Sequence, residues 1–201
     1  MLRVYGDVHS GNSYKLKLLL NQLDMKHEWI HVDIVKQETR TPEFLAKNPN
    51  GKVPVVELTN GIFLSESNAI LHYLADGTPL LPHGKFQHAQ VLQWMFFEQY
   101  SHEPNIATSR FIIQSLGRPA DKEELLKAKV APGYKALDVM EKHLGVHNYF
   151  VAERYTIADI ALYAYTHVAH EGGFDLGNYP KIRTWLQRVH DQAGYVGMNA
   201  P

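Results

Sequence analysis

Two short polar stretches of the chain come directly before helical patterns. The run "SGNS" (10–13) precedes one amphipathic pattern, and Glu66 and Ser67 precede another. The start of a helix presents unpaired backbone N–H groups that attract anions, and a serine hydroxyl can donate a hydrogen bond beside them. The same residue types are also ordinary helix caps. For Ser10 and for Ser67, the local sequence therefore leaves open both a chemical role and a capping role.

A third stretch, "GKVPVVEL" (51–58), contains a proline inside a run of β-branched residues. Proline has no backbone N–H, so within sheets it is confined to edge strands, bulges or the first residue of a strand. We expect the strand to begin at Pro54, with a missing ladder hydrogen bond beside it. A plain edge-strand proline is the alternative.

Composition excludes several classes of chemistry. The chain has 201 residues, no cysteine and a formal net charge of −1. Disulfides, thiolate metal sites and a cysteine nucleophile of the protein's own are therefore ruled out. Charges of both signs are mixed along the chain, which gives no electrostatic footprint for nucleic acid. His167 and His170 have a spacing that suits metal, but no third ligand accompanies them, and we expect no metal site.

The hydropathy pattern predicts no membrane span, because no run of about 18 apolar residues occurs. The first residues lack the apolar core of a signal peptide. A cytoplasmic location is the expectation.

The first third of the sequence alternates between strand and helix patterns. Asn60-Gly61 between two apolar runs indicates a hairpin. The Thr41-Pro42 pair suits the start of a short helix. The predicted order is β-α-β-α-β-β-α, with strands over 2–7, 27–34, 53–58 and 62–67 and helices over 13–23, 41–48 and 67–76.

The remainder of the chain shows only helical patterns after a linker rich in proline and glycine. A long helix with a bend near Glu103-Pro104 is expected first, because proline interrupts the internal hydrogen bonds of a helix. Thr156 and Asp159 have the spacing of a capping box. The predicted organisation is an α/β domain, a linker and an all-α domain, over 1–76, 77–85 and 86–201; the predicted helices cover 86–115 and 121–144, with two more opening near 156 and 180.

The α/β pattern with a proline at its third strand resembles the thioredoxin fold. Followed by an all-helical domain, it resembles the soluble glutathione transferases of the bacterial or theta-like serine type. The resemblance covers essentially the whole chain and is carried by four motifs in order: "SGNSYKLKLLL" (10–20), "NPNGKVPVVEL" (48–58), "LSESNAILHYLA" (64–75) and "TIADI" (156–160).

The resemblance implies a catalytic role for Ser10, whose hydroxyl would stabilise the thiolate of glutathione. Tyr5 and Asn12 are the competing donors. It also implies that the Val53-Pro54 bond is cis, so that the backbone of Val53 turns outward to pair with the cysteinyl backbone of glutathione.

Other glutathione contacts are implied at the two ends of the peptide. Glu66 suits the amine of the γ-glutamyl group, and Ser67 suits its carboxylate. Lys52 could contact a glutathione carboxylate, and Thr39 and Arg40 lie where related enzymes contact the glycyl end.

The implied second substrate is a hydrophobic, electrophilic small molecule lying between the domains. Tyr100, His102 and Arg110, with Phe111, are the candidate wall residues. The absence of cysteine excludes thiol transfer through the protein's own sulfur. Peroxide or disulfide reduction with glutathione itself as the thiol remains an alternative, as does a non-catalytic binding protein.

A homodimer is also implied by the resemblance. Asn50 and Gly51 occupy the region where some animal classes keep an aromatic key. We therefore expect a flatter, more polar interface than the key-in-lock type.

Overall fold

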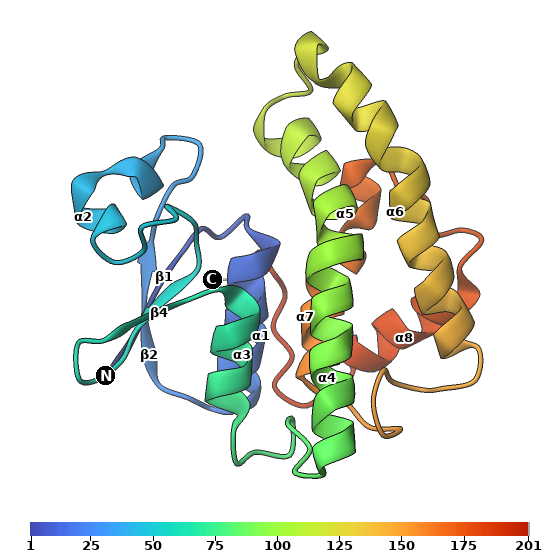
Figure 1. Ribbon diagram of the computed structural model, residues 1–201, viewed down its shortest axis with the longest axis horizontal. Coiled ribbons are helices and arrows are strands. Elements are labelled where there is room, and N and C mark those ends of the chain that lie inside the picture. The colour runs from blue at the N-terminus through green and yellow to red at the C-terminus, as the bar shows by residue number, and fades with distance from the viewer. Residues whose placement is uncertain (201) are drawn as a thin grey trace. The chain divides into compact units, whose positions relative to one another are not determined.

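The chain folds in the β-α-β-α-β-β-α order that its first third predicts. The computed structural model describes residues 1–200. One mixed sheet has the strand order β2-β1-β3-β4, in which β1 and β2 are parallel and the other pairs antiparallel. Figure 1 shows α1 and α3 on one side of this sheet and α2 on the other. The elements are β1 (Leu2–Gly6), α1 (Gly11–Gln22), β2 (His27–His31), α2 (Pro42–Leu45), β3 (Val55–Glu57), β4 (Phe63–Ser65) and α3 (Ser67–Ala75).

Local signals place the starts of these helices. Ser10 is the N-cap of α1, so that helix begins two residues before the predicted start at 13. Thr41 accepts a hydrogen bond from the backbone of Phe44, with Pro42 in the first turn of α2, as predicted. Four leucines of α1 are fully buried, Leu16, Leu18, Leu19 and Leu20. Burial of such side chains is the main source of stability for a helix of this length.

Pro54 lies directly before β3, which begins at Val55. The Val53-Pro54 peptide bond is cis, which confirms the expectation drawn from the family resemblance. The strand thus begins one residue later than the predicted start at Pro54, and no ladder hydrogen bond inside it is lost.

A segment from the far end of the sequence completes this first unit. Residues 1–76 and 193–200 form one compact unit, called here the N-terminal unit. Three side chains of α1 hold the segment 193–200: Tyr14 donates to the carbonyl of Val196 (2.8 Å), Lys17 to that of Met198 (3.3 Å) and Asn21 to that of Gly194 (2.7 Å). The predicted helical domain, 86–201, includes this segment, so the prediction is wrong for these residues. The segment has no helical periodicity that would have indicated either unit.

Residues 77–192 form a second compact unit, the helical unit. No helix within residues 1–200 has both the length and the apolar character needed to cross a membrane. The helices of the helical unit are α4 (Lys85–Phe97), α5 (Glu103–Arg110), α6 (Glu123–Leu144), α7 (Ile157–Thr166) and α8 (Pro180–His190), with short 3-10 turns at Ala120–Lys122 and Ala169–Gly172.

Near Pro104, where a bend is predicted, the structure has a π-helical turn directly before the proline. The chain passes from α4 into α5 through a π-helical turn, Glu98–His102, and leaves α5 through a second one, Phe111–Ser115. In a regular α-helix the ring of Pro104 would clash with the carbonyl four residues earlier. The wider turn directly before it accommodates the ring without ending the helix.

The core of the helical unit is organised around α7, every residue of which is buried. The predicted capping box is confirmed, with Thr156 and Asp159 bonded reciprocally. The Asp159 carboxylate also accepts hydrogen bonds from the Phe150 backbone (3.2 Å) and the Trp185 indole (2.9 Å). One fully buried acid therefore joins the start of α7 to the preceding loop and to α8.

Candidate functional site

The N-termini of α1 and α3 lie together at one edge of the N-terminal unit. The Ser67 hydroxyl, on the first residue of α3, donates to the Asn12 side-chain oxygen in the first turn of α1 at 3.1 Å. Both helices therefore direct their unpaired first-turn N–H groups to the same region. Two positive helix ends beside hydroxyl and amide groups form a setting that favours an anion.

Ser10 is the N-cap of α1, which is one of the two roles that the sequence leaves open. Its hydroxyl oxygen accepts a hydrogen bond from the Ser13 backbone at 3.3 Å, which is the N-cap interaction. Its own N–H donates to the Asp7 carbonyl at 3.1 Å, fixing the loop before the helix. A hydroxyl has one proton and two lone pairs, and the cap uses one lone pair. The geometry of Ser10 is thus compatible with donation of its proton to a bound anion.

Tyr5 is less suited to activate a thiol. Its hydroxyl donates to the Glu57 carboxylate at 2.8 Å, and its ring packs beside Phe63, with ring centroids 6.3 Å apart. The ring belongs to the cluster around Phe44 of α2, on the α2 face of the sheet. Burial and the hydrogen bond to Glu57 raise the pKa of Tyr5. A hydroxyl already held by a carboxylate is a poor donor for a second anion.

Glu66 has an unusual backbone conformation at the entry to α3. Its φ is +69°, a region that few residues other than glycine occupy, and its side chain is exposed. Such conformations cost about 1–3 kcal/mol and collect at functional sites. Ser67 beside it is only 4% exposed. The strained residue thus projects a carboxylate to solvent next to the buried serine hydroxyl.

The loop before the cis-proline is held by side chains on both sides. The buried Asn48 amide donates to the carbonyl of Lys52 at 2.8 Å, and the Arg40 guanidinium donates to the Asn50 carbonyl at 3.3 Å. The Lys52 side chain is exposed and Val53 is partly buried. Arg40 is exposed and contacts this loop through one guanidinium N–H. Thr39, another predicted contact, is only 6% exposed.

The structure places a buried lysine, Lys15, beside Ser67, and the residues predicted for the site do not include it. Its side chain is fully buried, and its ammonium lies 3.4 Å from the Ser67 hydroxyl and 3.3 Å from the side-chain oxygen of Asn68. Its spacing of three residues from Asn12 places both on one face of α1. The available signal was the position of Lys15 directly before the buried leucines.

The candidate residues for a second substrate differ in accessibility. Tyr100 is 89% exposed. His102 is fully buried, and its ring bonds the Thr166 hydroxyl at 2.9 Å. Arg110 pairs with Glu171 at 2.6 Å, and Phe111 is 38% exposed. The burial of His102 does not favour direct contact with a substrate, whereas Tyr100 is exposed in the single subunit.

The two histidines considered for metal binding lie in the helical unit. The ring of His167 stacks on Tyr163 and bonds its carbonyl at 2.9 Å, and burial lowers the pKa of His167 to about 4. Over residues 1–200, no three His, Cys, Asp or Glu side chains gather as a metal site would require.

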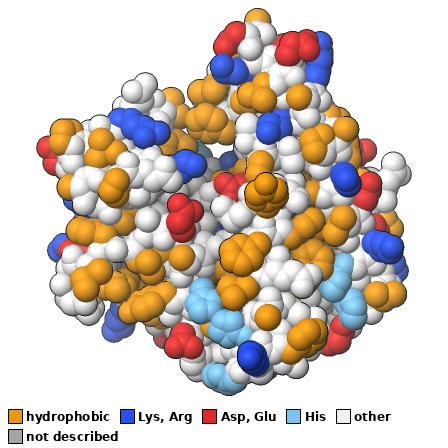
Figure 2. Space-filling model, in the orientation of Figure 1, with side chains coloured by type: hydrophobic (Ala, Val, Ile, Leu, Met, Phe, Trp, Pro, Cys, Tyr) orange, Lys and Arg blue, Asp and Glu red, His pale blue; other side chains and the backbone are white. Residues whose placement is uncertain are grey.

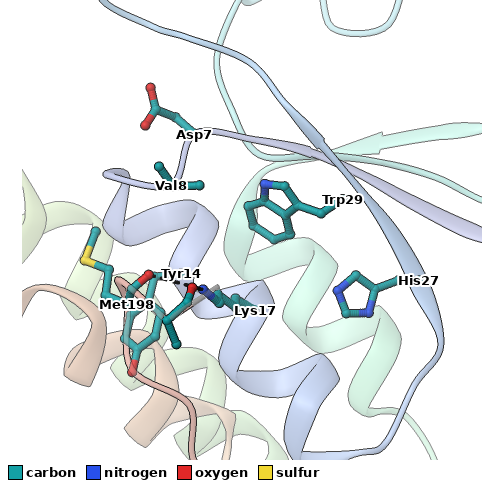
Figure 3. Close-up of a pocket in the computed structure, with 8 residues that line it drawn as sticks. Asp7, Val8, Tyr14, Lys17, His27, Trp29 and Met198 are labelled. Carbon is teal, nitrogen blue, oxygen red and sulfur yellow. Dashed lines mark hydrogen bonds between the residues drawn. The ribbon is translucent and has the colours of Figure 1, made fainter.

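A cavity of about 260 Å³ lies on another face of α1, within the N-terminal unit. Figure 3 shows Tyr14 beside Met198, and Lys17 with a hydrogen bond toward the segment 193–200. Two residues apart on a helix, Lys15 and Lys17 are separated by about 200° around the axis. Lys17 therefore donates to the segment 193–200, whereas Lys15 donates to the Ser67 hydroxyl. The cavity is lined by Asp7, Val8, Tyr14, Lys17, His27, Trp29, Met198 and Ala200.

A thioredoxin-like unit with a cis-proline loop, followed by a helical unit, defines the fold class of the glutathione transferases. Comparison with protein-family models gives the same assignment for both units. The glutathione S-transferase N-terminal domain matches residues 1–76, and the glutathione S-transferase C-terminal domain matches residues 100–193. The chain belongs to the glutathione S-transferase family.

Individual relatives support this assignment. A glutathione S-transferase structure from Pseudomonas fluorescens is 57% identical, with a TM-score of 0.96 and 98% of each chain covered. Glutathione S-transferase F10 of Arabidopsis thaliana is 32% identical, covering 100% of this chain and 97% of its own. The disulfide-bond oxidoreductase YfcG of Escherichia coli is 28% identical, covering 90% of this chain and 86% of its own.

Proposed function

We propose that this protein is a glutathione transferase that joins the glutathione thiolate to hydrophobic, electrophilic small molecules. The observation that carries the proposal is the meeting of the α1 and α3 N-termini, with the Ser10 hydroxyl at the start of α1 and the Ser67 hydroxyl at the start of α3. Membership of the glutathione S-transferase family supports the choice of glutathione as the anion.

In this proposal, binding and activation are divided among different residues. The Ser67 hydroxyl and the N-terminus of α3 hold the γ-glutamyl carboxylate, and Glu66 holds the amine. The Val53 backbone pairs with the cysteinyl residue, and Lys52 reaches a carboxylate. Pro54 keeps the Val53 backbone in place.

Ser10 is the proposed activating group. A thiol with a pKa of about 8.5 is only a few per cent ionised at pH 7, and lowering the pKa by about two units requires roughly 2.7 kcal/mol of selective stabilisation. A hydrogen bond from Ser10 and the N-terminus of α1 supply stabilisation of that kind. With a halonitroarene, the thiolate lone pair forms a C–S bond and the halide departs with the electrons of the carbon–halogen bond. With a conjugated enone, the thiolate forms the C–S bond, the carbon–carbon π electrons move toward the carbonyl oxygen, and a proton from solvent completes the addition.

Disulfide reduction is the second candidate function, favoured by the similarity to YfcG. Because this chain contains no cysteine, glutathione would have to supply the attacking thiol. Glutathione-dependent peroxide reduction uses the same activated thiolate, and a non-catalytic glutathione-binding protein would retain the site without turnover.

A panel assay separates these possibilities. Purified protein is incubated with glutathione and, in turn, a halonitroarene, a conjugated enone, an organic hydroperoxide and a mixed disulfide, while calorimetry measures glutathione binding. We expect binding and turnover of the first two substrates. Turnover of the mixed disulfide or hydroperoxide alone would replace conjugation by the second function. Binding without any turnover would indicate a binding protein, and absence of binding would refute the proposal.

We also propose a homodimer. Exposed apolar side chains of the helical unit include Phe86, Phe96 and Tyr100, at 71%, 69% and 89% exposed. Figure 2 shows hydrophobic side chains gathered over α4. The N-terminal unit has an exposed aromatic side chain of its own on α3, Tyr73. In the proposed dimer, the hairpin-and-α3 face of one subunit packs on the 86–115 helical stretch of the other.

A further inference from the structure

The burial of Lys15 requires a reason. Its side chain is fully buried, and burying a charged group is costly unless the group is compensated. Leucines fill the neighbouring positions of α1 at no such cost. Two of the oxygens that receive its ammonium belong to Ser67 and Asn68, in the first turn of α3. A lysine at this position therefore links the interior of α1 to the place where α3 begins.

The hydrogen bonds around Ser67 have a defined direction. A lysine ammonium can only donate, and an amide oxygen can only accept. The Ser67 oxygen must therefore accept from Lys15 and donate its proton to Asn12. The hydroxyl has one proton, so a bound carboxylate would receive it in place of the Asn12 oxygen while the Ser67 oxygen continues to accept from Lys15. Donation from a cation makes this O–H a stronger donor.

We propose that Lys15 is a positioning residue for the γ-glutamyl carboxylate of glutathione, acting through the Ser67 hydroxyl and through its charge. This inference rests on the proposed function. A carboxylate oxygen bonded to Ser67 would lie within about 6 Å of the ammonium, which is two hydrogen-bond lengths. At that distance an incompletely screened cation strengthens binding by about one to two powers of ten.

The test pairs a change in the protein with a change in the ligand. The ligands are glutathione and 4-aminobutyryl-cysteinylglycine, which is glutathione without the γ-glutamyl α-carboxylate. The variants are Lys15→Met, Lys15→Gln and Lys15→Arg, with Lys17→Met as the matched control on the opposite face of α1. KM, kcat and calorimetric Kd are measured for each combination.

In Lys15→Met and Lys15→Gln we expect the KM for glutathione to rise about 10- to 100-fold, with kcat changed by less than about threefold. The analogue should be bound almost equally by wild type and by both variants. Lys15→Arg should recover at least part of the preference for glutathione, and Lys17→Met should keep all of it. The glutamine variant retains a hydrogen-bond donor, so it carries the test if the methionine variant does not fold.

Equal losses for glutathione and for the analogue would overturn the inference, since Lys15 would then only hold the two helices together. An unchanged KM for glutathione in folded Lys15→Gln would overturn it as well. Both results leave the proposed function standing. A wild-type protein that binds neither ligand refutes the proposed function itself.

Discussion

At the scale of single residues, the two possible roles of Ser10 use different parts of one hydroxyl group. The cap needs the oxygen as an acceptor for the Ser13 N–H, whereas thiolate stabilisation needs the proton. Substitutions that keep one property and remove the other can therefore separate the roles.

We predict that Ser10→Ala loses both properties. Its free energy of unfolding should fall by about 1 kcal/mol through loss of the cap, and turnover should fall about 10- to 100-fold through loss of one hydrogen bond to a charged group. Ser10→Asp keeps an acceptor for the cap but brings a negative charge to the thiolate. We expect it to retain stability and to lose turnover at least as strongly. Urea unfolding and the ultraviolet absorbance of bound thiolate against pH measure the two effects.

Tyr5→Phe and Asn12→Ala are the comparison variants for this prediction. A thiol pKa that stays constant in Ser10→Ala and rises in either of the others would transfer the activating role to that residue. A constant thiol pKa in all three would leave activation to the helix N–H groups alone.

At the scale of elements, the capping box of α7 is centred on Asp159, whose carboxylate accepts hydrogen bonds from Thr156, Phe150 and Trp185. Burial raises the pKa of Asp159 to about 6, against the opposing effect of its hydrogen-bond donors. We predict that Asp159→Ala lowers the free energy of unfolding by about 3–5 kcal/mol, because buried donors on Phe150, Thr156 and Trp185 lose their acceptor. Chemical denaturation followed by tryptophan fluorescence measures this loss.

Glu124→Ala is the matched control, since Glu124 is an exposed acid in the first turn of α6. Its effect should stay within about 0.5 kcal/mol. A similar small loss in Asp159→Ala would mean that the network contributes little to stability.

The starts of helices and the position of the hairpin could be predicted where the residues that define them are close together in the sequence. The Thr41-Pro42 start, the Asn-Gly hairpin and the capping box each depend on residues within a few positions of one another. The contact between Lys15 and Ser67 was not predictable in this way, because the two residues are 52 positions apart and a lysine in a helical pattern is usually solvated. The π-helical turn before Pro104 depends on packing around the helix, which periodicity does not report.

At the scale of the whole molecule, the exposed aromatic residues of α4 and the turn after it lead to a prediction about assembly. We predict that the wild-type protein sediments as a dimer at micromolar concentration. Phe96→Glu should shift it to monomer, because a charge placed in an apolar contact loses its hydration. Analytical ultracentrifugation distinguishes the two states.

Val146→Glu, a similar change at a residue that is 80% exposed after α6, should leave the dimer intact. A monomeric wild type would refute the dimer itself. A Phe96→Glu protein that remains dimeric would place the interface elsewhere.

The return of residues 193–200 to α1 has a consequence for the order of events on the ribosome. Its hydrogen bonds to α1 join residues that are 173 to 182 positions apart in the chain. At about 5–20 residues per second, synthesis of the intervening chain takes roughly 10 to 35 seconds. During that interval the Tyr14 face of α1 lacks the cover that residues 193–200 later provide.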